Sequence, residues 1–434
     1  IAWSEDGKSW NGLGSSIFSA SGFGVAWNGS LWVAVGAGTN TIAWSEDGKT
    51  WNGLGISVFN GYNGFGRGVA WNGSIWLALG TGNNTIAWSE DGKNWTGLGS
   101  SIFSEGFDVA WNGSMWVAVG VPPGGWYSQG KNSIAWSEDG KTWNYINTGN
   151  PFGNDGGVKI AWNGSIWVVG GVGGNGGTLA WSEDGKNWTS VTNWQNRGNA
   201  RCSGLAWNGS MWLATGVGID GNNTISRSED GKNWTSVSNT ENNGGIDVAW
   251  NGSVWVILGN QTNTMAWSND GENWTGLGRQ IFNTYGLAVA SKNVLPYTDK
   301  WANCQKNTPP PPAASPPAPA PALAQCISSE FMMAVGMPVG NYNTGGVAML
   351  WSEDGKNWNA VEKTPFSYCM DIAWNGSMWV AVGWSSGTRP VQGTSTIAWS
   401  EDGKNWNVVN DQLFGSYCYG IAWNGSMWVA VGSG

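Results

Sequence analysis

Two short motifs alternate along this chain, and their regular return limits what it can fold into. The first reads Ile-Ala-Trp-Ser-Glu-Asp-Gly-Lys-x-Trp, with small variations, and its serine recurs at Ser4, Ser45, Ser89, Ser137, Ser182, Ser228, Ser268, Ser352 and Ser400. The second reads Val-Ala-Trp-Asn-Gly-Ser-x-Trp, and its first tryptophan recurs at Trp27, Trp71, Trp111, Trp162, Trp207, Trp250, Trp374 and Trp423. Successive copies are mostly about 40 to 50 residues apart, a period typical of a closed or stacked array of one supersecondary unit.

Each repeat predicts four β-strands in two hairpins. Gly24–Trp27 and Leu31–Val35 are short apolar runs joined by Asn28-Gly29, and Asn-Gly is a strong signal for a tight two-residue hairpin turn. Thr41–Trp44 and Thr50–Leu54 flank the acidic Ser-Glu-Asp-Gly-Lys box and form the second hairpin. Of the 37 tryptophans, only Trp126, Trp194, Trp301 and Trp384 lie outside these strand positions. A tryptophan buries roughly 150–250 Å², so we interpret the repeated tryptophans as the core of an all-β fold.

The acidic box has a known counterpart. Ser45-x-Asp47-Gly48-x-x-Trp51 resembles a shortened form of the Asp-box, or BNR repeat, of sialidases, sortilin-like receptors and many secreted propellers, in which one more residue usually separates Asp from Gly. The resemblance implies a β-propeller of four-stranded blades. In each blade the Ser and Asp side chains would cap the second hairpin, Gly would be left-handed and Trp would pack beneath. Nine repeats predict nine blades; the alternative is seven blades followed by a partial second array.

The two ends of the chain are complementary parts of one repeat. Ile1–Leu13 corresponds to the second hairpin and Tyr419–Gly432 to the first, so we expect them to pair and close a ring with no exposed edge. The same phase would permit head-to-tail pairing between molecules. Because the sequence opens inside a repeat and has no signal peptide, we expect it to derive from a longer precursor. The domains expected are blade repeats over 1–303, an insert over 304–326 and the remaining repeats over 327–434.

The insert interrupts one hairpin, whose two strands we place at Gly286–Ala290 and Phe331–Gly336. Its proline-rich centre predicts a stiff polyproline II spacer. Cys304 and Cys326 bracket it, and a disulfide between them would contribute roughly 3 kcal/mol. The segment resembles hydroxyproline-rich modules of plant and green-algal extracellular glycoproteins, which implies hydroxylation and O-linked sugars at Pro309, Pro310, Pro311, Pro312, Pro316, Pro317, Pro319 and Pro321.

Three further cysteines, Cys202, Cys369 and Cys418, occupy equivalent positions five residues before the first tryptophan of their repeats. We interpret them as small buried residues. The alternative is a bridge between Cys369 and Cys418, which belong to neighbouring repeats.

Many asparagines lie in Asn-x-Ser/Thr sequences, the acceptors of N-linked sugars. They are Asn28, Asn72, Asn112, Asn163, Asn208, Asn251, Asn375 and Asn424 in Asn-Gly-Ser, Asn94, Asn187, Asn233 and Asn273 in Asn-Trp-Thr, and also Asn83, Asn222 and Asn260. The turn explains Asn-Gly but does not by itself require the serine that follows in all eight copies. We therefore predict N-glycosylation on the face that carries both hairpin turns.

The composition excludes several functions. The chain has no histidine, so it lacks the commonest general base and zinc ligand, and we expect no metal and no other cofactor. The net charge of −9 comes from the acidic boxes while the other charges nearly balance, so we expect no nucleic-acid surface. No apolar stretch approaches the roughly 18 residues of a membrane-spanning helix.

Three classes of function remain. A sialidase-like enzyme needs an arginine cluster, but Arg67, Arg197, Arg201, Arg227, Arg279 and Arg389 fall at unrelated phases of the repeat. Asp108, Asp247 and Asp371 share one repeated position, which is typical of a scaffold, so we predict that the chain is not an enzyme.

A carbohydrate-binding propeller is the second class. It would use Trp126, Trp194 and Trp384 and the long connections Val121–Ser133 and Trp384–Thr396 on the face opposite the hairpin turns. The hypothesis we favour from sequence is a secreted, self-assembling structural glycoprotein of a cell or particle surface. Its partners would be further copies of itself and glycans.

Overall fold

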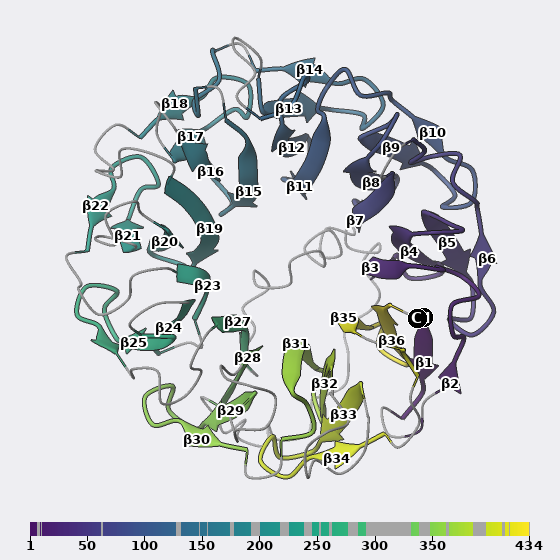
Figure 1. Ribbon diagram of the computed structural model, residues 1–434. Coiled ribbons are helices and arrows are strands. Elements are labelled where there is room, and N and C mark those ends of the chain that lie inside the picture. The colour runs from purple at the N-terminus through teal and green to yellow at the C-terminus, as the bar shows by residue number, and fades with distance from the viewer. Residues whose placement is uncertain are drawn as a thin grey trace, which may run out of the picture.

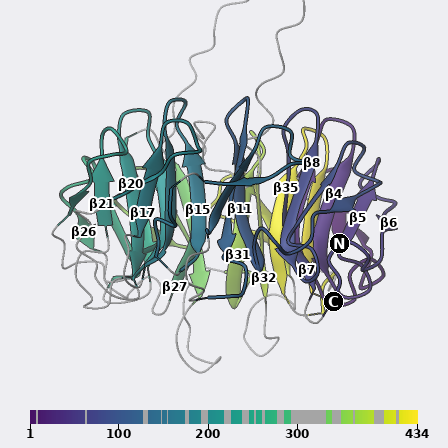
Figure 2. The same ribbon diagram turned by 90° about the horizontal axis from the view of Figure 1, so that it is seen from above.

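The computed structural model describes residues 1–6, 9, 11–61, 64–126, 132–146, 148–153, 155–173, 178–191, 200–217, 225–237, 245–250, 253–259, 263–276, 285–291, 331–337, 348–361, 364–384, 396–409, 413–415 and 417–433. These residues form an all-β propeller. Four-stranded units stand side by side around a central axis (Figure 1), and their strands run between the two faces of the ring (Figure 2). No helix occurs in these ranges.

One unit shows the pattern of all. Its strands are β3 (Ser21–Trp27), β4 (Trp32–Ala37), β5 (Ile42–Ser45) and β6 (Asn52–Gly53), antiparallel and in that order from the axis outward (Figure 1). The same order recurs in β7 (Phe65–Trp71), β8 (Trp76–Thr81), β9 (Ile86–Ser89) and β10 (Thr96–Gly97); β11 (Glu105–Trp111), β12 (Trp116–Val121), β13 (Ile134–Ser137) and β14 (Asn144–Tyr145); β15 (Gly157–Trp162), β16 (Trp167–Gly173), β17 (Leu179–Ser182) and β18 (Thr189–Ser190); β19 (Ala200–Trp207), β20 (Trp212–Val217), β21 (Ile225–Ser228) and β22 (Thr235–Ser236); β23 (Gly245–Trp250), β24 (Trp255–Gly259), β25 (Met265–Ser268) and β26 (Thr275–Gly276); and β31 (Tyr368–Trp374), β32 (Trp379–Trp384), β33 (Ile397–Ser400) and β34 (Asn407–Val408).

Two units join segments that are distant in the sequence. β27 (Tyr285–Ser291) pairs with β28 (Met332–Met337), with β29 (Met349–Ser352) and β30 (Asn359–Ala360) beside them. β1 (Ala2–Ser4) pairs with β36 (Trp428–Gly432) within the same chain, in a sheet ordered β2 (Asn11–Gly12), β1, β36, β35 (Cys418–Trp423). The strands make five four-stranded sheets and two eight-stranded sheets. Each eight-stranded sheet joins two consecutive four-stranded units, so the number of sheets is not a count of blades. Nine blades, with seven as the alternative, stay a prediction.

The first hairpin turn is longer than the sequence predicted. Trp27 pairs with Trp32, so the loop has four residues, Asn28–Leu31, and a two-residue Asn-Gly turn is wrong. The side-chain oxygen Oδ1 of Asn28 accepts hydrogen bonds from the backbone N–H groups of Ser30 at 2.9 Å and Leu31 at 2.7 Å. The asparagine side chain thus replaces a turn carbonyl as acceptor, and Gly29 takes the left-handed φ of 101° that this path requires.

The acidic box is a capped turn. Asp47 Oδ1 accepts the backbone N–H of Lys49 at 2.8 Å, and Ser45 Oγ accepts that of Gly48 at 2.8 Å while donating to Asp47 at 3.0 Å. Trp51 Nε1 donates to the carbonyl of Gly48 at 2.8 Å. These contacts agree with the roles that the Asp-box resemblance implies for Ser, Asp and Gly. The family itself stays a prediction.

In eight units the core contains a pair of tryptophans, and in the unit of β27 to β30 the buried Met332 holds the second-strand position. The tryptophan that begins the second strand is at most 1% exposed in every described copy: Trp32, Trp76, Trp116, Trp167, Trp212, Trp255, Trp379 and Trp428. Each lies 5.0 to 5.3 Å, centroid to centroid, from the tryptophan that ends the first strand, in a tilted arrangement. The interpretation of these tryptophans as core is therefore confirmed.

The box glycine joins each core to the unit before it. Gly48 has a φ of 71°, and a Cβ there would lie 3.1 Å from Nε1 of Trp32 and overlap the sulfur of Met427. Met427 belongs to the neighbouring unit, next to β36. Elsewhere Leu31 takes the place of Met427 at Gly92, and Met115 does so at Gly185. Neighbouring units thus interlock where only glycine fits.

Charged side chains repeat at the same junctions. The Lys49 ammonium lies 2.5 Å from a carboxylate oxygen of Glu5 and 4.8 Å from the ring centroid of Trp3, both in the preceding unit. Five equivalent lysines make both contacts with the preceding box: Lys93, Lys141, Lys186, Lys232 and Lys404. Such exposed pairs contribute roughly 0.2–1 kcal/mol each.

One junction reverses its charges in a correlated way. Arg227 replaces the tryptophan of its box motif, Glu272 replaces the lysine of the following box, and the two side chains form an ion pair. A lysine beside Arg227 would be repelled, and a lone Glu272 would face the acidic box before it. Each of these two changes from the repeat motif therefore compensates the charge that the other introduces.

We expect this compensation to appear in a double-mutant cycle. Arg227→Trp and Glu272→Lys should each lower the free energy of unfolding by about 1 kcal/mol, and the double variant should return to within about 0.5 kcal/mol of the parent. Urea unfolding monitored by tryptophan fluorescence measures the cycle. Pairing Arg227→Trp with Lys93→Glu, at a distant box, is the control and should show no rescue. Additive effects in the adjacent pair would contradict the junction.

The boxes also predict an acid transition. Burial alone would raise the pKa of Asp184, but hydrogen bonds from Asn187 and Lys186 outweigh it and lower that pKa to about 2; the pKa values of Asp230, Asp354 and Asp402 are lowered to about 2 in the same way. A carboxyl with a depressed folded pKa stabilises the fold above its unfolded pKa of about 3.9, and this contribution disappears as the pH falls through the folded pKa. The melting temperature should therefore fall between about pH 4 and pH 2; an unchanged value at pH 2 would contradict the capped turns.

Candidate functional site

Two positions of the innermost strands vary although their neighbours repeat. One, four residues before the first tryptophan, holds Phe23, Arg67, Phe107, Val158, Ser203, Ile246, Met370 and Tyr419. The other, six residues before it and at or just before the start of the strand, holds Ser21, Phe65, Glu105, Gly156, Arg201, Tyr368 and Tyr417 in the described units. The first position falls inside a register shift of the strand pairing, as between Gly22 and Gly24 in β3. Such bulges re-aim side chains and often border functional sites.

Aromatic side chains at these positions, together with Trp384 and Trp126, form a row that Arg67 bridges at one point and that we term the aromatic arc. It consists of Tyr368, Trp384, Tyr417, Tyr419, Phe23, Phe65, Phe107 and Trp126. Most come from the innermost strands β31, β35, β3, β7 and β11, which follow one another around the axis in Figure 1. The arc therefore spans five consecutive units.

One half of the arc is a stack. Trp384 lies between Tyr368 and Tyr417, with ring centroids 5.1 and 5.5 Å away and interplanar angles of 14° and 22°. Tyr417 stacks in turn on Tyr419 at 5.8 Å, and Tyr419 meets Phe23 at 5.8 Å. Phe23 is 37% exposed, so the stack ends on an accessible ring.

A half-buried arginine, Arg67, completes the other half. Phe23 contacts Phe65 at 5.3 Å, and the Arg67 guanidinium then lies over both Phe65 at 5.2 Å and Phe107 at 4.6 Å. Arg67 is also 3.3 Å from a carboxylate oxygen of Glu105. Burial lowers the pKa of Arg67 and the Glu105 carboxylate opposes that shift; an arginine remains charged under both influences. The arc then ends at Phe107 and Trp126, 6.0 Å apart.

A pocket opens beside Phe65. It has a volume of 720 Å³ and is lined by Ala37, Gly64, Phe65, Thr81, Gly82, Asn83, Ser104 and Glu105. Ala37 and Thr81 end second strands, so the pocket lies on the face opposite the hairpin turns, where the sequence analysis expected binding. It combines one aromatic ring with a carboxylate, an amide and hydroxyls.

Inner-strand aspartates bind backbone rather than facing one another. Asp108 Oδ2 accepts the N–H of Ile160, in the next unit, at 3.2 Å, and Asp371 Oδ2 accepts that of Ile421 at 3.2 Å. These contacts support the scaffold role predicted for this position. In the described residues, no group of three or more potential metal ligands occurs, nor does a helix long and apolar enough to span a membrane.

The three tryptophans predicted to contact a ligand lie in different parts of the chain. Trp126, 40% exposed, and Trp384 both belong to the aromatic arc, whereas Trp194 lies outside the described residues. Phe23, Arg67 and Tyr419 were not predicted as site residues from the sequence, because they sit inside the repeat. The signal that marks them is variation at one position among otherwise constant neighbours.

The predicted glycosylation sites have structural roles of their own. In the described Asn-Gly-Ser turns the serine hydroxyl donates to the asparagine Oδ1 at 3.1 to 3.2 Å, at Asn28, Asn72, Asn112, Asn163, Asn208, Asn375 and Asn424. In the box, the amide nitrogens of Asn94, Asn187, Asn233 and Asn273 donate to Oδ2 of the box aspartate. Asn357 and Asn405 make the same contact without being acceptor sequences. The turns thus account for both patterns, and glycosylation stays a prediction.

The remaining nominated residues divide between described and undescribed parts of the chain. Asn83 is exposed and lines the pocket. Asn222, Asn251, Asn260, Cys304, Cys326 and the prolines of the insert lie outside the described residues. Cys202, Cys369 and Cys418 are free and fully buried, and burial raises the pKa of the Cys202 thiol to about 12. They are therefore buried residues and no bridge joins Cys369 to Cys418.

Comparisons with known proteins agree with the fold. A scan of protein-family models and a search of curated proteins gave no match. The chain is similar to the computationally designed Ika8 protein, with a TM-score of 0.50 and 10% identity over 92% of this chain and 99% of that one. YCF48 bound to D1 peptide has a TM-score of 0.40 and 16% identity, covering 63% and 87%. The GH74 enzyme of Niastella koreensis has a TM-score of 0.30 and 15% identity, covering 89% and 75%. At these identities only the fold is shared.

The turn contacts predict how the asparagines respond to substitution. Asn28→Ala leaves two backbone N–H groups without their acceptor and should cost about 1 kcal/mol, whereas Asn28→Asp keeps the acceptor and should cost less than about 0.5 kcal/mol. Unfolding in urea of protein made in a host without N-glycosylation measures both. Equal losses would show that the side-chain oxygen is not the reason for asparagine here.

Proposed function

We propose that this chain is a non-catalytic carbohydrate-binding propeller, which holds an extended sugar chain along the aromatic arc. The observation that supports this most directly is the row of partly exposed rings across five units. Sugar rings have apolar faces and polar edges, and partly exposed aromatic rings bordered by polar groups suit such molecules. Where both faces of a ring are covered, as in Trp384 between Tyr368 and Tyr417, the exposed edge of the ring would make the contact.

The length of the arc favours a chain over a single sugar. Its ring contacts have centroids 5.1 to 6.0 Å apart, and the Arg67 guanidinium lies between Phe65 and Phe107. The arc curves around the axis and continues over strands from five units. A ligand that used it fully would therefore be several sugars long.

The carboxylates near the arc support binding without hydrolysis. A glycosidase places two carboxyl groups on either side of the bond it cleaves, roughly 5–9.5 Å apart. Glu105 is engaged by Arg67, while Asp108 and Asp371 accept backbone N–H groups of the next unit. Asp108 and Asp371 thus hold the inner strands in place, and the guanidinium beside Glu105 balances its charge.

The self-assembling glycoprotein favoured from sequence becomes the second candidate. Its support is the ring of exposed Asn-Gly-Ser turns. Head-to-tail strand exchange would have to break the pairing of β1 with β36, which forms within one chain. We keep the cell or particle surface as the proposed location, where polysaccharide ligands are abundant.

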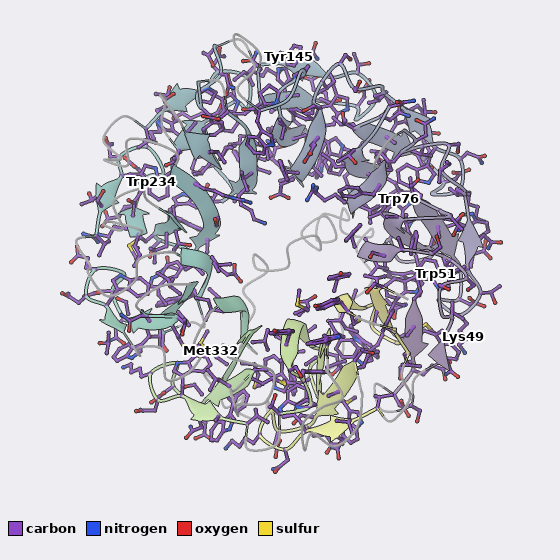
Figure 3. All side chains as sticks on the ribbon, in the orientation of Figure 1. Lys49, Trp51, Trp76, Tyr145, Trp234 and Met332 are labelled. Atoms are coloured by element: carbon purple, nitrogen blue, oxygen red, sulfur yellow. The ribbon has the colours of Figure 1, made fainter. Side chains whose placement is uncertain are left out.

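Substituting arc residues tests the proposal. Trp384→Ala and Phe23→Ala should each weaken binding of a glycan about tenfold, equivalent to about 1.4 kcal/mol, with the fold intact by circular dichroism. A glycan array identifies the ligand and titration calorimetry measures the affinities. Tyr145→Ala is the matched control, because this ring is also 40% exposed but lies on the outer rim (Figure 3).

Two results would contradict a glycan-binding arc. One is a folded parent protein that binds no carbohydrate on the array. The other is equal loss of affinity in the Tyr145→Ala control, which would place the contact on the outer rim instead.

A further inference from the structure

The pocket beside Phe65 extends sideways from the aromatic arc. Its inner wall is formed by Phe65 and Glu105, at the starts of the innermost strands β7 and β11. Its outer wall is formed by Thr81 and Asn83, at the end of β8 and in the connection that follows. Since first strands lie nearest the axis and second strands outside them (Figure 1), the pocket runs outward, across the direction of the arc.

The arc does not end at this pocket. Beyond Phe65 it continues through the Arg67 guanidinium to Phe107 and Trp126. A linear sugar chain lying along the arc would therefore pass the mouth of the pocket without entering it. A group that fills the pocket must leave the chain at an angle.

The lining suits a sugar. The volume of 720 Å³ lies within the roughly 300–1,000 Å³ of sites for drug-sized ligands, so the pocket has more than enough room for one sugar ring. Phe65 offers a flat apolar face. Arg67 occupies only part of the accepting capacity of Glu105, since a carboxylate has about four lone-pair sites, and the rest can accept sugar hydroxyls. The Asn83 amide can both donate and accept.

The outer wall is held in place before any ligand arrives. The backbone N–H of Asn83 donates to the carbonyl of Asn60 at 2.7 Å. Gly82 has a φ of 115°, and a Cβ there would overlap that same carbonyl. Gly64 is packed as closely against the backbone of Phe59. Such preorganisation reduces the entropy lost on binding.

We propose that this pocket binds a short sugar branch of a glycan whose backbone lies on the aromatic arc. The inference rests on the proposed function and adds the substrate class: a branched polysaccharide is preferred over its linear counterpart. Phe65 serves both surfaces, because it lines the pocket and belongs to the arc.

Matched pairs of oligosaccharides separate backbone from branch. The probes are cellohexaose with its xylose-branched form and mannohexaose with its galactose-branched form, together with the linear and branched pairs of a glycan array. The parent protein should bind the branched member of one pair at least about tenfold more tightly than the linear member. Protein from a host without N-glycosylation keeps Asn83 unmodified.

Two variants address the pocket and leave the arc untouched. Asn83→Ala removes the amide and Ala37→Phe fills the space from the opposite wall; each should bring the affinity for the branched member to within about twofold of the linear one. The affinity for the linear member should not change. Thr39→Ala is the matched control, because Thr39 holds the position of Asn83 in the neighbouring unit and is exposed.

Each outcome bears on one proposal or on both. Trp384→Ala should weaken linear and branched ligands alike. If linear and branched members bind equally and the pocket variants change neither, the branch site is overturned while the proposed function stands. If no carbohydrate binds the folded chain, both are overturned. A sugar attached to Asn83 in native material would also overturn the branch site, because the chain's own glycan would fill the pocket.

Discussion

The close packing of the box glycine between two units is the contact on which the ring depends. Gly48 lies against Nε1 of its own buried Trp32 and against Met427 of the unit before it. A side chain there would overlap Met427, and the φ of 71° is one that residues other than glycine rarely adopt. Ser45 and Asp47 accept hydrogen bonds from the backbone N–H groups of this turn and hold it, so the acidic box fixes the distance between neighbouring cores.

The packing at the box glycine determines which positions of the repeat must stay constant and which can vary. A second-strand tryptophan lies against the box glycine in five described units. A departure from the motif is tolerated where its neighbour compensates, as Arg227 and Glu272 do. The bulge position of the innermost strand lies outside these contacts, since the strand pairing skips it. Phenylalanine, arginine and tyrosine can therefore occupy it without disturbing the core. Phe23, Phe107 and Tyr419 of the aromatic arc occupy this variable position.

The sequence was sufficient for what the repeat dictates locally. Period, strand number per repeat, capped box and buried tryptophans all follow from residues close together in the chain. The four-residue loop at Asn28–Leu31 did not, because a side-chain acceptor changes the turn without changing its Asn-Gly signature. The aromatic arc and the pocket could not be predicted from the sequence either. Tyr419 and Phe23 are nearly the whole chain apart and meet only because the ring closes, and the pocket draws its walls from three units.

The same rigidity explains why a repeat protein would place its binding surface on the inner strands. Aromatic side chains have few rotatable bonds, and those of the arc are already held by one another, as Trp384 is between Tyr368 and Tyr417. Little conformational entropy remains to be lost when a ligand packs on them. Arg67 extends the row where an aromatic ring is missing, because its planar guanidinium lies over Phe65 and Phe107 while Glu105 balances its charge. A continuous surface across five units therefore needs no departure from the repeated core.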